Sequence, residues 1–76
     1  MVRTYTLLTC AAGTSERVCR ELSAVDGVDG AHVVVGEFDV ILELEGPDVQ
    51  SLLRLVSVEI RPREGVGTTR TYVCLD

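Results

Sequence analysis

A strand-like spacing dominates the pattern of apolar and polar positions along this chain. Residues 38–45 alternate between apolar and polar side chains, interrupted only by Ile41, and a repeat of two predicts a strand with one buried face. Residues 3–10, 28–35 and 66–75 are rich in β-branched and aromatic side chains, which are enriched in strands. The sequence therefore predicts four strands.

The first of two predicted helices lies between the first two strands. Val18, Leu22 and Val25 recur at intervals of four and three residues, which places them on one face of a helix. A hydroxyl side chain at position 14 or 15 can cap the start of this helix. We expect the helix to end before Gly27.

The second predicted helix follows the third strand. Pro47 suits the first helical position, and the acidic Asp48 is favourable in the first turn. The helix should end before Pro62, because proline cannot continue it. Its apolar face is formed by Val49, Leu52, Leu53, Val56 and Ile60.

The predicted elements follow one another in the order βαββαβ, and the two halves of the chain resemble each other. Each half runs strand, helix, strand, with a Gly-Val pair after its helix, at 27–28 and at 65–66. A doubled βαβ unit is the ferredoxin-like arrangement of the α+β class. We therefore expect one domain over residues 1–76, a four-stranded antiparallel sheet with two helices on one face, and the first strand between the third and the fourth.

A two-residue hairpin turn is predicted between the second and third strands, at Gly36-Glu37. Turns of this kind need a residue with positive φ, which glycine adopts without steric cost. Gly36 is therefore expected to supply the turn.

The sheet face away from the helices is predicted to be partly apolar. Leu7 and Leu8 are adjacent and so point to opposite faces, and the same holds for the three valines at 33–35. Ile41 also interrupts the polar side of its strand. An antiparallel sheet that faces water on one side alternates cleanly. We therefore expect another copy of the chain to cover this face.

Charge and composition argue against several classes of function. The chain has 7 basic residues, all arginine, and 12 acidic residues, for a net charge of −5, which disfavours binding to nucleic acid. No apolar stretch approaches the roughly 18 residues of a membrane span, and the start does not resemble a signal peptide. We expect a cytoplasmic protein with no membrane or nucleic-acid partner.

Metal and catalytic chemistry are also poorly supported. Cys10, Cys19 and Cys74 lie far apart in the sequence, and His32 is the only histidine, so neither a metal-ligand spacing nor a disulfide framework is present. His32 lacks a nameable nucleophile or orienting partner. We predict no catalytic residue, no metal and no cofactor.

Two motifs resemble one known family. The first is Gly36-Glu37-Phe38-Asp39-Val40, continued by Ile-Leu-Glu-Leu, and the second is Gly65-Val66-x-x-Thr69-x-Thr71-Tyr72-Val73. With the acidic helix start at Asp48, they resemble the effector-binding domain of the Lrp/AsnC family of feast/famine regulators over nearly the whole chain. The resemblance implies a ferredoxin-like fold, dimers joined through their sheets, ring-like assemblies, and small effectors, usually amino acids, bound where dimers meet.

The chain departs from full regulators of this family in two ways. They carry an N-terminal helix-turn-helix domain, whereas the first strand here begins almost at Met1, so the chain is similar to the stand-alone members. Relatives often have proline directly before the glycine at position 65, where this chain has Arg63-Glu64. We expect that difference to alter the loop and not the fold.

The resemblance also implies an effector site at the hairpin. Exposed backbone groups of Gly36 and Glu37 would hold the carboxylate and ammonium of an amino acid, and Asp39 would accept a hydrogen bond from the amine. The alternative for Asp39 is a carboxylate that satisfies hairpin N–H groups. Tyr72 and Val73 match positions near the effector site and the assembly interface, although packing explains Val73 equally well.

The function expected from these features is binding rather than catalysis. We expect a stand-alone amino-acid binding and oligomerisation module, a homodimer or higher oligomer, with a DNA-binding Lrp/AsnC regulator as candidate partner. One alternative is a small enzyme of the dimeric α/β-barrel type, although three aromatic residues and one histidine provide little for its pocket. The other is an ACT-like regulatory subunit, which shares the element order.

Overall fold

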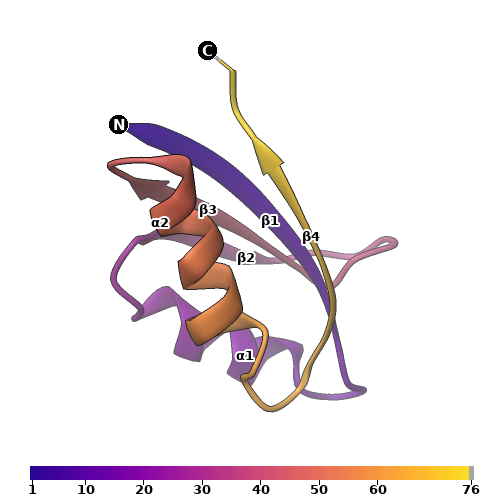
Figure 1. Ribbon diagram of the computed structural model, residues 1–76. Helices are drawn as coiled ribbons and strands as arrows, with labels where there is room; N and C mark the ends of the chain where they lie inside the picture. The colour runs from indigo at the N-terminus through magenta and orange to yellow at the C-terminus, as the bar shows by residue number, and fades with distance from the viewer. Residues whose placement is uncertain (76) are drawn as a thin grey trace.

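The elements of the chain occur in the predicted order βαββαβ (Figure 1). The computed structural model describes residues 1–75. The elements are β1 (Val2–Cys10), α1 (Ser15–Ser23), β2 (Val28–Val33), β3 (Val40–Gly46), α2 (Val49–Leu55), the π-helical turn η1 (Val56–Ile60) and β4 (Val66–Val73).

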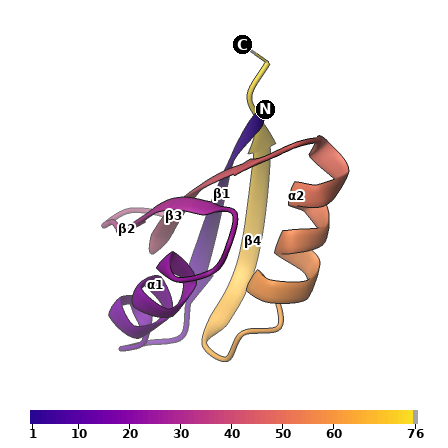
Figure 2. The same ribbon diagram turned by 90° about the vertical axis from the view of Figure 1, so that its left-hand side faces the viewer.

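The four strands form one antiparallel sheet in the order β2-β3-β1-β4. The first strand therefore lies between the third and fourth, as predicted. Leu8 of β1 is paired with Val40 on one side and with Thr69 on the other. Figure 2 shows the long strands β1 and β4 side by side and the two helices apart from each other.

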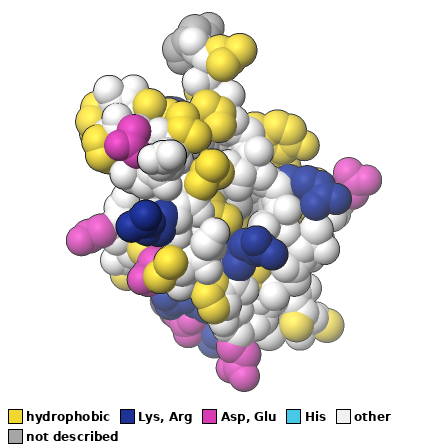
Figure 3. Space-filling view, in the orientation of Figure 1, with side chains coloured by type: hydrophobic (Ala, Val, Ile, Leu, Met, Phe, Trp, Pro, Cys, Tyr) yellow, Lys and Arg dark blue, Asp and Glu magenta, His cyan; other side chains and the backbone are white. Residues whose placement is uncertain are grey.

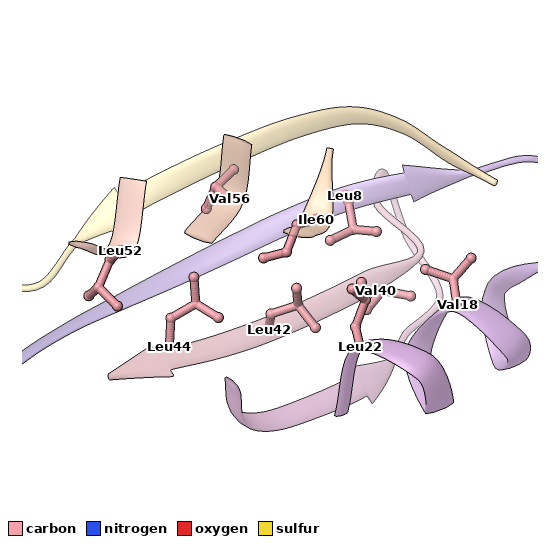
Figure 4. Packing of buried hydrophobic residues seen from close by; sticks show 9 residues of the cluster. All are labelled: Leu8, Val18, Leu22, Val40, Leu42, Leu44, Leu52, Val56 and Ile60. Atoms are coloured by element: carbon pink, nitrogen blue, oxygen red, sulfur yellow. The ribbon is translucent and has the colours of Figure 1, made fainter. Parts of the chain in front are cut away.

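The core lies on one face of this sheet, beneath both helices. Alternate residues of β3 are fully buried at Val40, Leu42 and Leu44, because a strand directs every second side chain to the same face. These side chains meet the helices and Leu8 in one cluster (Figure 4). The other members of the cluster are Val18, Leu22, Leu52, Val56 and Ile60. The predicted fold class is therefore confirmed.

The start of each helix differs from the prediction. Asp48 is not in the first turn of α2 but is its N-cap, and its side chain accepts a hydrogen bond from the backbone N–H of Ser51 at 2.7 Å. Asp48 has extended backbone angles (φ −154°), so Pro47 precedes the helix instead of opening it. Thr14 precedes α1, but its hydroxyl donates to the carbonyl of Ala11 and does not cap the helix.

The π-helical turn η1 lets residues spaced by four remain on the buried side of the second helix. An α-helix rotates about 100° per residue, so residues four apart drift by about 40° and residues eight apart by about 80°. The wider turn of η1, marked by the hydrogen bond from the N–H of Arg61 to the carbonyl of Val56, rotates less per residue. Leu52, Val56 and Ile60 are consequently all buried at a constant spacing of four.

The internal repeat extends to hydrogen bonds around its two glycines. Gly27 and Gly65 adopt φ values of 98° and 99°, which non-glycine residues rarely reach. The carbonyl of Gly27 accepts from the N–H of Glu45, and the carbonyl of Gly65 accepts from the N–H of Ala11. Each half thus ends its helix with a glycine turn whose carbonyl binds the backbone of the other half, within β3 at Glu45 and just beyond β1 at Ala11.

The loop between β2 and β3 is longer than predicted. The strands stop at Val33 and Val40, so six residues, 34–39, connect them instead of a two-residue turn at Gly36-Glu37. Within residues 1–75 the glycines with positive φ are Gly13, Gly27 and Gly65, so the predicted role of Gly36 is wrong. The hydrogen bond from the N–H of Val34 to the carbonyl of Asp39, at 2.9 Å, closes this wider loop.

Candidate ligand-binding site

The loop of residues 34–39 is anchored to β1 through Asp39. The N–H of Asp39 donates to the carbonyl of Leu8 at 2.9 Å, and its carboxylate oxygen Oδ2 accepts from the N–H of Cys10 at 2.8 Å. The pairing of β1 with β4 shifts register between Leu8 and Cys10. Asp39 therefore binds backbone at an irregular point of the central strand, so part of its carboxylate has a structural role.

The same environment affects the thiol of Cys10. Burial raises the pKa of Cys10, and the negative charge of Asp39 acts in the same direction. Burial also raises the pKa of Cys19. Both groups are therefore neutral thiols near pH 7, and within residues 1–75 all three cysteines are free.

The tip of this loop is open to solvent. Val35, Gly36 and Glu37 are exposed, and a side chain added at Gly36 would meet nothing within 4 Å. In Figure 1 the connection between β2 and β3 projects beyond the sheet. The backbone groups of Gly36 and Glu37 are thus accessible to a molecule outside the protomer.

Tyr72 and Val73 lie away from the loop in the single protomer. Tyr72 is paired with Tyr5, whereas Asp39 contacts β1 at Leu8, three residues or about 10 Å further along the strand. Tyr72 and Val73 are also adjacent in β4 and so point to opposite faces. The structure therefore brings Gly36, Glu37 and Asp39 together but does not bring Tyr72 and Val73 to them.

The sheet face away from the helices carries the predicted apolar residues and an ion cluster that was not predicted. Leu7 and Ile41 are half-buried and paired with each other. Arg3 contacts three carboxylates, those of Asp29, Glu43 and Glu45, at 3.0, 3.3 and 3.2 Å. Hydrogen bonding to Asp29 is the main cause of the raised pKa of Arg3.

His32 extends this ion cluster. Its Nε2 lies 2.8 Å from Oε2 of Glu43, because His32 and Glu43 occupy neighbouring strands and point to the same face. The sequence contained a signal for the cluster: with β1 antiparallel to β3, Arg3 lies opposite Glu45. Cross-strand pairing, once the strand order is set, predicts that contact.

A second feature missed by sequence reasoning is a groove between the two helices. It has a volume of about 520 Å³ and is lined by Ala24, Val25, Asp26, Leu55 and Glu59. Its walls are the turn after α1 and the junction of α2 with η1. Each wall therefore contributes both apolar and acidic side chains.

Comparison with known proteins identifies the family. A sequence model of the Lrp/AsnC ligand binding domain matches residues 4–76. The chain belongs to the Lrp/AsnC family. The proteins of similar sequence are transcriptional regulators of the helix-turn-helix type, so the family is one of regulators and not of enzymes.

One such relative is a helix-turn-helix regulator of Pyrococcus abyssi, 30% identical over 63 residues. The match covers 83% of this chain and 42% of the relative, so the chain spans about two fifths of the length of that protein. A hypothetical protein of Pyrococcus horikoshii is 31% identical, with a TM-score of 0.92 over 99% of this chain and 90% of its own.

A more distant structure has the same fold. It is a transcriptional regulator of Neisseria meningitidis in complex with L-Met, 16% identical, with a TM-score of 0.82 over 99% of this chain and 50% of its own. Within residues 1–75, no helix has the length and apolar character needed to cross a membrane.

Proposed function

We propose that this Lrp/AsnC domain is a small-effector sensor that binds an amino acid at the tip of the 34–39 loop. The proposal rests on one observation: this loop has an anchored base and an exposed tip. Asp39 binds the base of the loop to β1, while Gly36 and Glu37 at the tip are exposed. A fixed loop with free backbone groups is pre-organised for a ligand. The L-Met complex of the Neisseria regulator supports an amino acid as the ligand class.

Each loop residue has a proposed contact. The backbone groups of Gly36 and Glu37 hydrogen bond the carboxylate and the ammonium of the effector. Asp39 supplies negative charge for the ammonium through its second oxygen, because Oδ2 is engaged by Cys10. Tyr72 and Val73 complete the wall from a neighbouring copy, since their own protomer holds them away from the loop.

The proposed assembly unit is a homodimer joined through the open sheet faces, with dimers associating further around the effector. Leu7 and Ile41 form the apolar centre of this face, and Tyr5 and Tyr72 are paired beside them with 36% and 58% of their surfaces exposed. Aromatic and aliphatic groups of this kind are common at the centre of interfaces. The ion cluster around Arg3 would lie toward one end.

We further propose that the domain acts in the cytoplasm by modulating a separately encoded DNA-binding regulator of the same family. Its membership of the Lrp/AsnC family and its similarity to helix-turn-helix regulators support this role. Its net charge of −5 favours action through a protein partner and not through direct contact with DNA.

The experiment is a measurement of oligomeric mass by light scattering, with and without each member of an amino-acid panel, followed by calorimetry for any amino acid that shifts the mass. A ligand held between dimers must favour the larger assembly by mass action. We expect at least one amino acid to do so. If none binds, the sensor proposal is wrong.

A further inference from the structure

The groove between the helices occupies one of two positions related by the internal repeat. Residues of the first half match residues of the second half 38 positions later, as shown by the turn glycines Gly27 and Gly65. The buried helix residues follow the same offset, Val18 with Val56 and Leu22 with Ile60. Equivalent positions in the two halves can therefore be compared directly.

In one half, a guanidinium fills the position beside the turn. A Cβ added at Gly65 would lie 2.9 Å from Nη2 of Arg17. Arg17 donates to the carbonyl of Glu64 at 3.1 Å and pairs with Glu21 at 3.2 Å. A cation from α1 thus links the turn to a carboxylate one helical turn further on.

In the other half, the same position holds Leu55 and the groove. A Cβ added at Gly27 would lie 2.9 Å from Cδ2 of Leu55, which is the repeat partner of Arg17. The repeat partner of Glu21 is Glu59, and that of Glu64 is Asp26; both line the groove. This half therefore retains the two acidic residues, but it has Leu55 where the other half has the guanidinium of Arg17.

The ion pairs between the helices also lack a cation at the groove. Arg17, Glu21, Arg63 and Glu59 form a chain of alternating charge, with contacts of 3.2, 3.6 and 3.8 Å. The chain ends on the carboxylate of Glu59 at the groove, where its contact with Arg63 is the longest of the three. Asp26, on the facing wall, makes no ion pair with any of residues 1–75. A further cation beyond Glu59 would continue the alternation.

The remaining walls are fixed and apolar. The N–H of Val25 donates to Leu22 and that of Val28 donates to Val25, at 3.1 and 3.0 Å, which holds the turn in place. Ala24, Val25 and Leu55 provide aliphatic surface, which suits the methylene chain of an alkyl cation. A volume of about 520 Å³ is in the range of small-molecule sites.

We propose that this groove binds the guanidinium or ammonium group of a small alkyl cation, with free arginine as the representative ligand. Leu55 itself fills the place that Arg17 occupies in the other half, so the cation lies in the groove beside Leu55, between Glu59 and the turn at Asp26. Its methylenes lie against Val25 and Leu55. This site is separate from the effector site at the 34–39 loop and does not depend on it.

The test is a titration of the isotopically labelled full chain with L-arginine, followed by NMR. The matched probe is L-citrulline, which has nearly the same shape but carries no side-chain charge. Butylguanidinium serves as a third probe, which separates side-chain recognition from recognition of the whole amino acid. We expect L-arginine and butylguanidinium to shift the amide signals of Ala24, Val25, Asp26, Leu55 and Glu59, and L-citrulline to bind at least about tenfold more weakly.

Two variants localise the effect. Glu59→Gln should weaken the binding of L-arginine by roughly fivefold, because the carboxylate is half-exposed and partly screened, whereas Glu16→Gln, on the exposed side of α1, should not change it. Leu55→Arg should abolish binding, since the new guanidinium would fill the groove as Arg17 fills its counterpart. Equal binding of L-arginine and L-citrulline, or shifts at residues 34–39 in place of the groove, would overturn the proposal even if Leu55→Arg failed to fold.

Discussion

The carboxylate of Asp39 accepts a hydrogen bond from the backbone N–H of Cys10, with 2.8 Å between the nitrogen and Oδ2. Asp39→Ala leaves that half-buried N–H without a partner, so we expect the free energy of unfolding to fall by about 1–3 kcal/mol while the fold survives. Asp39→Asn retains an acceptor oxygen and should cost clearly less. Urea unfolding of the three proteins measures the difference.

The same pair of variants tests the proposed effector contact. If Asp39 also binds an effector ammonium, Asp39→Asn should weaken amino-acid binding by about tenfold or more while leaving the protein nearly as stable as the parent. Unchanged affinity in a folded Asp39→Asn variant would make Asp39 purely structural.

Two buried threonines of β1 differ in hydrogen bonding. The hydroxyl of Thr6 lies 3.0 Å from that of Thr71, whereas the fully buried hydroxyl of Thr4 has no hydrogen-bond partner within residues 1–75. Thr4→Val should therefore raise the free energy of unfolding by about 1 kcal/mol, and Thr6→Val should lower it by a similar amount. Thermal and urea unfolding compare them, and the idea fails if Thr4→Val is the more damaging substitution.

Ile41 lies on the open sheet face through which we propose that the dimer forms. Ile41→Glu would place a charge at the apolar centre of that interface, so association should weaken at least about tenfold. The matched control is Val58→Glu, an exposed position on the helix side, which should leave the dimer unchanged. Light scattering across a dilution series measures both. A parent chain that is monomeric at micromolar concentration contradicts the sheet-to-sheet dimer.

Asp48 makes stability depend on pH in acid. The hydrogen bond from the Ser51 N–H lowers the pKa of Asp48 below its ordinary value of 3.8. A carboxylate with a lowered folded-state pKa stabilises the native state above its unfolded pKa, and this contribution is lost as the pH falls through the folded-state value. Asparagine is an equally good N-cap without a charge. The stability of the parent relative to Asp48→Asn should therefore decrease between pH 5 and about pH 2, as measured by chemical unfolding at each pH; a constant difference would exclude the effect.

The thiols of Cys10 and Cys74 should remain unconnected. Cys10 ends β1, and the N–H of Cys74 donates to the carbonyl of Arg3 near the start of the same strand, a separation of roughly 20 Å at about 3.3 Å per residue. A disulfide spans only about 6 Å between Cα atoms. Intact-mass analysis after native oxidation should find no intramolecular bridge between them, and finding one would contradict the strand order.

The sequence was sufficient to predict the fold because each repeat of apolar residues was compatible with only one type of element, a strand or a helix. Val40, Leu42 and Leu44 repeat every two residues and Val18 and Leu22 every four, and the structure buries all five. The glycine turns were visible as a repeat. By contrast, the loop after β2 was predicted too short, because Val34 and Val35 extend the apolar run although they do not pair with β3.

The candidate site was less predictable, because its contacts join residues distant in sequence. The bond between Asp39 and Cys10 crosses 29 positions and depends on an irregularity in β1 that no local pattern signals. The groove between the helices also joins residues 24–26 to Leu55 and Glu59, which lie far apart in the sequence. Figure 3 likewise shows apolar and charged side chains mixed over one face, an arrangement that residue counts do not predict.

The strand order has a consequence for how the domain folds. In the order β2-β3-β1-β4, β3 separates the two strands of the first half and β1 separates the two strands of the second. Neither half therefore contains a pair of neighbouring strands of its own. Every strand pairing therefore joins the two halves. The β2–β3 pairing closes only the short loop of residues 34–39, whereas the pairings of β1 with β3 and with β4 close long loops. The chain should fold and unfold as one cooperative unit, with no half persisting as an independently folded intermediate.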